Sequence, residues 1–158
     1  SMSVKSTAYV GVAADLISTL APRVTIIFVS TKRECEDVAD QLARELNRIA
    51  GHVDVHSLHS EMPTGYQLRS IMSMRDCTGN LIGQVQRVLV ATDLAARGLD
   101  LPAIDLVLQF GVPMKAGKAI DRGAYTQRQH KRIDHELYMH RSGRAGRVGG
   151  GFLPIGYG

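Results

Sequence analysis

Residues 140–147 read His-Arg-Ser-Gly-Arg-Ala-Gly-Arg, in which small side chains separate the arginines. In a helical turn, Arg141, Arg144 and Arg147 would lie on one side, and the residues between them would not keep a large anion away. Guanidinium groups are permanently charged and donate paired hydrogen bonds to phosphate oxygens. The octet therefore predicts a phosphate clamp. The alternative is a flexible Gly/Arg segment that binds nucleic acid nonspecifically.

A second polar segment, residues 91–100, reads Ala-Thr-Asp-Leu-Ala-Ala-Arg-Gly-Leu-Asp and follows an apolar run. The hydroxyl of Thr92 is suited to donate a hydrogen bond to a nucleic-acid phosphate. Asp93 is a residue type typical of a helix N-cap. The segment therefore predicts a turn or short helix that presents a hydroxyl to an anion.

The end of this segment carries a guanidinium and a carboxylate. Asp100 is suited to bind a ribose hydroxyl, although an aspartate before Pro102 is also an ordinary cap. Arg97 either bridges two sites or pairs with a carboxylate, and Gly98 indicates a tight turn close to a ligand. The residues alone leave these alternatives open.

Apolar patterning predicts the elements that position these segments. Short apolar runs predict strands at residues 24–29, 53–58, 87–91, 106–110 and 152–155, and the first of them is dense in β-branched residues. Helical spacing predicts a helix from a Thr31–Glu34 capping box to Gly51. A second helix follows Pro63, with Leu68, Ile71 and Met72 on its apolar face.

Alternation of strands and helices predicts a mainly parallel sheet, in which ligands bind outside the carboxyl ends of the strands. Thr31 follows the first strand, His59 and Glu61 follow the second, and residues 92–100 follow the third. The arginine octet precedes the last strand. We therefore expect hydroxyl, carboxylate and guanidinium groups to share one edge of the sheet.

The composition is that of a single globular domain, which we assign to residues 1–158. The chain has 158 residues, of which 44% are hydrophobic and 22% are charged, and it contains no run apolar enough to predict a membrane span. Cys35 and Cys77 are too few for a disulfide framework or a zinc site. Residues 1–3 have the form of an expression-tag remnant, so we expect a piece of a longer protein.

The surplus positive charge is concentrated. Residues 114–134 contain six Lys or Arg residues and two Asp residues, a surplus equal to the net charge of +4 of the whole chain. This segment predicts a polyanionic partner, and a solvated surface loop is the alternative.

Taken together, the motifs resemble those of DEAD-box RNA helicases. Residues 25–32, 90–102 and 140–147 stand in the order of motifs IV, V and VI of that family, and residues 58–63 extend the similarity. The chain is similar to the second, carboxy-terminal RecA-like domain of such a helicase. The resemblance implies an α/β, RecA-like three-layer domain with a central, mainly parallel sheet flanked by helices. Within that family, the residues of motifs V and VI resemble those of the nucleolar RNA helicase II/Gu branch.

The resemblance implies roles at a nucleotide site. Arg144 and Arg147 match arginines that reach the γ-phosphate of ATP, and such an arginine finger contributes about 10³–10⁵ in rate. Asp100 matches the carboxylate that holds the ATP ribose, with Gly98 beside it. Arginine and histidine residues of motifs V and VI that bridge the two domains correspond to Arg97, His140 and Arg141.

It also implies an RNA-binding surface. Thr31 and Thr92 match hydroxyl contacts to the RNA backbone, and Phe28 matches the motif IV aromatic while also fitting the core. The usual Gln-x-x-Arg motif is altered, because only one residue separates Gln67 from Arg69. Arg69 is the stronger of these two candidates for an RNA contact.

Two segments are longer than the family pattern: residues 75–86 and the basic insertion at 114–134. The insertion is an additional RNA grip, a docking site for a partner or a surface loop. The resemblance implies an intracellular protein, with nucleus or nucleolus favoured over mitochondrion or cytoplasm.

The sequence contains neither a Gly-x-x-x-x-Gly-Lys-Ser/Thr phosphate loop nor an Asp-Glu-Ala-Asp box. We therefore expect the N-terminal RecA-like domain of the same protein to hold ATP and Mg²⁺. The chain alone is expected to be monomeric, to bind no membrane and to hydrolyse no ATP. The alternatives are a non-enzymatic basic RNA-binding module and a DNA-acting helicase of the same superfamily.

Overall fold

The computed structural model describes residues 4–75, 85–97, 104–111, 137–141 and 152–155. Within these ranges the strands form one six-stranded sheet in the order β2-β3-β1-β4-β5-β6. The strands are β1 (Val24–Val29), β2 (Val53–Leu58), β3 (Gln86–Thr92), β4 (Leu106–Phe110), β5 (Leu137–Arg141) and β6 (Phe152–Ile155).

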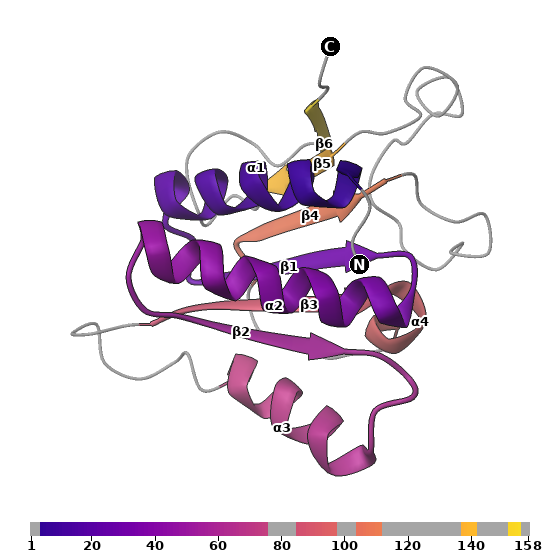
Figure 1. The fold of residues 1–158 in the computed structure, drawn as a ribbon. Coiled ribbons are helices and arrows are strands. Elements are labelled where there is room, and N and C mark those ends of the chain that lie inside the picture. The colour runs from indigo at the N-terminus through magenta and orange to yellow at the C-terminus, as the bar shows by residue number, and fades with distance from the viewer. Residues whose placement is uncertain (1–3, 76–84, 98–103, 112–136, 142–151, 156–158) are drawn as a thin grey trace.

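Helices cover both faces of this sheet. The described helices are α1 (Val4–Leu20), α2 (Lys32–Ile49), α3 (Thr64–Arg75) and the single-turn α4 (Asp93–Ala96). Helices α1 and α2 lie on one face, α3 lies on the other, and α4 follows the carboxyl end of β3 (Figure 1). The predicted three-layer α/β architecture is confirmed. None of the helices in the described ranges is long and apolar enough to cross a membrane.

The four strands β2, β3, β1 and β4 are parallel, as the alternation of elements predicts. In the centre of the sheet, Ile27 of β1 pairs with Val90 on one side and with Leu108 on the other. The two strands nearest the carboxy-terminus run the other way: β5 is antiparallel to β4, and β6 is antiparallel to β5. The sheet is therefore mixed at one side only, and β5 is a strand that the sequence analysis did not predict.

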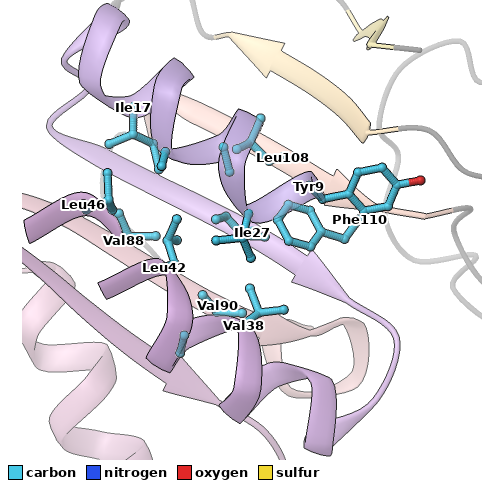
Figure 2. Close-up of a cluster of buried hydrophobic side chains, with 14 of the residues drawn as sticks. Tyr9, Ile17, Ile27, Val38, Leu42, Leu46, Val88, Val90, Leu108 and Phe110 are labelled. Atoms are coloured by element: carbon cyan, nitrogen blue, oxygen red, sulfur yellow. The ribbon is translucent and has the colours of Figure 1, made fainter. Parts of the chain in front are cut away.

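The larger core lies between the sheet and helices α1 and α2 (Figure 2). Helix α2 begins at its Thr31 cap, and Gly51, with φ +82, follows its last turn, as predicted. It turns Cys35, Val38 and Leu42 toward the strands, all of them fully buried. Helix α1 packs beside α2 through small and apolar side chains. At the edge of this core the rings of Tyr9 and Phe110 pack with centroids 5.4 Å apart.

The opposite face has a smaller core, and here the predicted apolar face of α3 is confirmed for Ile71, which packs against this core, but is wrong for the other two residues. Leu68 and Met72 are exposed, whereas Ser70 and Met74 are buried. The Ser70 hydroxyl donates a hydrogen bond of 2.9 Å to the carbonyl oxygen of Ser57 in β2. This bond and the burial of Met74 fix the rotation of the helix, so the more apolar pair faces outward.

Candidate nucleic-acid interface

The carboxyl ends of the parallel strands bring several predicted residues to one edge of the sheet (Figure 1). Thr92 ends β3 and pairs in register with Val29, the last residue of β1. Thr31 lies two residues beyond Val29, and His59 follows the end of the edge strand β2. The predicted gathering of polar residues at this edge is therefore confirmed for the loops that follow β1, β2 and β3.

Thr31 is an exposed residue that caps helix α2. Its Oγ1 accepts a hydrogen bond of 3.1 Å from the backbone N–H of Glu34, as a helix N-cap does. Accepting this bond leaves the hydroxyl proton to be donated. The side chain can therefore stabilise α2 and donate to a phosphate oxygen at the same time.

Thr92 repeats this arrangement at the end of the neighbouring strand. Its Oγ1 accepts a hydrogen bond of 3.4 Å from the backbone N–H of Ala95. The structure makes Thr92 the N-cap of α4 and Asp93 the first helical residue, so the predicted cap at Asp93 is wrong by one position. The reason is that the β-region backbone of Thr92 places its hydroxyl over the open amides of the turn.

An ion pair joins two of the loops at this edge. Lys32 Nζ donates to Glu61 Oε2, which connects the start of α2 to the loop after β2. The hydrogen bond from Lys32 holds the pKa of the Glu61 carboxyl below its usual range, and the positive charge of Lys32 acts in the same direction. Because both side chains are more than half exposed, this pair positions the loop more than it stabilises the fold.

A second contact anchors the same loop from beneath. His59 is buried, and its Nε2 lies 2.8 Å from Oε1 of Glu36, the fifth residue of α2. The backbone of the loop closes on itself, because the N–H of Met62 donates to the carbonyl oxygen of His59. The residues that follow β2 are therefore held against α2 by two side-chain contacts.

The altered Gln-x-Arg motif divides into a structural and an exposed residue. Gln67 Nε2 donates a hydrogen bond of 2.7 Å to the carbonyl oxygen of Met62, so its amide holds the loop to the helix. The exposed Arg69 places its guanidinium carbon 5.4 Å from the ring centroid of Tyr66. Tyr66 is not among the site residues predicted from the sequence, although its position three residues before Arg69 in a helix places both side chains on neighbouring rows.

The predicted nucleotide-site residues are only partly within the described ranges. Arg97 caps the carboxyl end of α4, where its backbone N–H bonds the carbonyl oxygen of Leu94, and it is exposed. Gly98 and Asp100 lie outside the described residues, as do Arg144 and Arg147.

His140 and Arg141 differ from their predicted setting. They belong to β5, so the helical turn expected at Arg141 is wrong. In the antiparallel register, His140 pairs with Val107 and Arg141 with Leu106, the first residue of β4. Since β4 is parallel to β1, this register places the backbone of His140 and Arg141 at the amino edge of the sheet. That edge is opposite the carboxyl edge, which carries Thr31 and Thr92. The predicted common edge is therefore wrong for His140 and Arg141.

Both long connections lie largely outside the described residues: positions 76–84 of the first, and the whole basic insertion at 114–134. Within the part that is described, no three His, Cys, Asp or Glu side chains are grouped so that they could hold a metal ion.

Several known proteins are similar in sequence to this chain. The ATP-dependent RNA helicase DBP8 of Vanderwaltozyma polyspora is 34% identical over 111 residues, covering 70% of this chain and 19% of that protein. A probable eukaryotic initiation factor 4A of Trypanosoma cruzi is 32% identical over 135 residues, covering 85% of this chain and 26% of that protein. DEAD-box ATP-dependent RNA helicase 53 of Oryza sativa is 34% identical over 124 residues, covering 78% of this chain and 15% of that protein. The chain thus spans well under half the length of these relatives.

Among solved structures, S. cerevisiae Dbp5, in a variant bound to a variant of Gle1 and to IP6, is similar with a TM-score of 0.55 and 27% identity. The match covers 89% of this chain and 31% of that one. These relatives confirm the resemblance to DEAD-box RNA helicases that the ordered motifs indicate. The helicase conserved C-terminal domain family matches residues 10–149, so the chain belongs to that family.

Proposed function

We propose that this chain is the carboxy-terminal RecA-like half of an ATP-dependent RNA helicase. The observation that carries the proposal is the adjacency of Thr31 and Thr92. The two threonines follow neighbouring parallel strands, and each caps the helix that begins beside it. Each hydroxyl keeps a proton to donate, so the pair can hold successive phosphates of a single strand without reading its bases.

The nucleotide role is assigned to residues matched by motifs V and VI. Arg144 and Arg147 neutralise charge as the γ-phosphoryl group of ATP leaves, and Asp100 holds the ribose, with Gly98 and Arg97 close by. The domain-bridging role of His140 and Arg141 remains a prediction from motif VI. ATP and Mg²⁺ are bound mainly by another domain, so closure of the two halves is required for hydrolysis.

The experiment uses the protein that carries this chain together with its ATP-holding domain. Arg147→Ala is expected to lower kcat for RNA-stimulated ATP hydrolysis by about 10³-fold or more, with RNA affinity nearly unchanged. Arg48→Ala is the control, because Arg48 is an exposed residue of α2 that pairs with Glu45 within its own helix. Equal loss of hydrolysis and RNA binding in Arg147→Ala would contradict the finger role.

A further inference from the structure

The outward face of α3 is unusual for a surface helix. Tyr66, Leu68 and Met72 are 56%, 54% and 61% exposed. The twelve residues of α3 include Arg69 and Arg75 and no acidic residue. An exposed apolar surface with surplus positive charge is complementary to a partner that combines flat apolar groups with negative charge. Single-stranded RNA has both.

Tyr66 and Arg69 together form a specific feature on this face. The Arg69 guanidinium lies over the Tyr66 ring, 5.4 Å from its centroid, and restrains the ring from one side. More than half of Tyr66 remains exposed despite this contact. A tyrosine ring restrained in this way can accept a nucleobase on its open side, while the arginine balances the phosphate charge.

The pair is connected to the carboxyl edge of the sheet, which carries Thr31 and Thr92, through the loop before α3. The backbone N–H of Tyr66 donates to the carbonyl oxygen of Pro63, so the tyrosine belongs to the first turn of α3. The loop before this turn is connected through Glu61 to Lys32, which is the neighbour of Thr31. Strand β2 ends at the carboxyl edge of the sheet, and α3 begins after the short loop that follows it (Figure 1).

We propose that Tyr66 and Arg69 form a base-stacking subsite for single-stranded RNA, next to the backbone grip of Thr31 and Thr92. The proposal rests on the proposed function, because it requires an RNA strand at this edge. It adds a contact to a base where the threonines contact only the backbone.

The test uses the protein that carries this chain together with its ATP-holding domain, and it measures the affinity of that protein for a fluorescently labelled oligouridylate by anisotropy. A matched series carries one abasic site, moved along the strand. Tyr66→Ala is expected to weaken binding of the intact strand about tenfold, and Tyr66→Phe, which keeps the ring, is expected to bind as the wild type does. An abasic site at the stacked position should weaken wild-type binding equally and remove the effect of Tyr66→Ala.

Arg44→Ala is the control for a change in exposed charge, since Arg44 pairs with Asp40 on α2. If Tyr66→Ala binds every strand as the wild type does while Thr31→Val weakens binding, the stacking subsite is overturned and the backbone grip stands. The subsite is also overturned if Tyr66→Phe is as weak as Tyr66→Ala, or if no abasic position removes the effect. If the wild-type protein binds no RNA, the proposed function and this inference both fail.

Discussion

His59 Nε2 lies 2.8 Å from Glu36 Oε1, and this contact joins the loop after β2 to the amino-terminal part of α2. The two partners differ in environment, because the His59 side chain is 6% exposed and that of Glu36 is 64% exposed. Within the described ranges, His59 Nδ1 is buried without a hydrogen-bond partner. The bond from Nε2 to Glu36 therefore compensates part of the cost of burying this imidazole.

Removing the carboxylate at Glu36 should leave a buried nitrogen without its acceptor. Glu36→Ala is expected to lower the free energy of unfolding by about 1–3 kcal/mol, and Glu36→Gln, which keeps an acceptor, by less. Urea denaturation measures both. Asp40→Ala is the matched control on the same helix. Asp40 and its partner Arg44 are both exposed, so Arg44 stays hydrated when the carboxylate is removed. A loss as large in Asp40→Ala as in Glu36→Ala would contradict the prediction.

Thr31 should contribute separately to stability and to RNA binding. Thr31→Val keeps the shape but removes the acceptor for Glu34 N–H, and it is expected to lower the free energy of unfolding by about 1 kcal/mol. It should also weaken RNA binding, because the hydroxyl proton is lost. Thr31→Ser, which keeps a hydroxyl, is expected to retain both the stability and the RNA affinity of the wild type, as measured by urea denaturation and anisotropy. Reduced stability with unchanged RNA affinity would confirm the cap and contradict the phosphate contact.

The Cys35 thiol should make stability depend on pH in the alkaline range. It is buried in the core, and burial is the main cause that raises its pKa from an ordinary 9.0 to about 11. Its Sγ lies 3.0 Å from the carbonyl oxygen of Val90. Since the folded pKa is above the unfolded one, the thiol favours folding fully below pH 9, and this contribution is lost as pH rises through about 11.

The expected loss between these two pH values is roughly 2–3 kcal/mol in the free energy of unfolding. Cys35→Ala should lose less over the same interval, because lysines and tyrosines titrate in both proteins but the thiol is absent from the variant. Urea denaturation at a series of pH values measures the difference. Parallel pH profiles for the wild type and Cys35→Ala would contradict the assignment.

The parallel part of the fold could be predicted because its strands are buried on both faces. All six side chains of β1 are buried, so the apolar run at residues 24–29 has no solvent-facing alternation to obscure its limits. The bounds of α2 could also be predicted, because Thr31 caps its first turn and Gly51 follows its last turn. These signals are local, and each could be read within a few residues.

The elements that the sequence analysis missed depend on contacts distant in sequence. The outward face of α3 contains Leu68 and Met72, because a hydrogen bond to Ser57 decides which side of the helix meets the sheet. Strand β5 exists through pairing with β4, whereas the sequence pattern predicts no element at residues 137–139 and a helical turn that includes Arg141. Helix α1 was also not predicted, although Val10, Ala13 and Ile17 have helical spacing, because its apolar residues are small and nearly continuous.

The 158-residue chain by itself should neither hydrolyse ATP nor bind RNA tightly. Its sequence has no phosphate loop, and Ala-Gly-Lys-Ala at residues 116–119 lacks both the first glycine and the hydroxyl that such a loop requires. Without those groups, nothing in the sequence is expected to hold Mg²⁺ or to position the attacking water.

A phosphate-release assay with and without RNA measures the expected lack of ATP hydrolysis, and anisotropy across a salt series measures the expected weak RNA binding. RNA-stimulated hydrolysis would contradict the division of the ATP site between two domains. Tight, salt-sensitive binding would instead favour a non-enzymatic RNA-binding module, because a basic surface acting alone releases counterions in proportion to the phosphates that it neutralises.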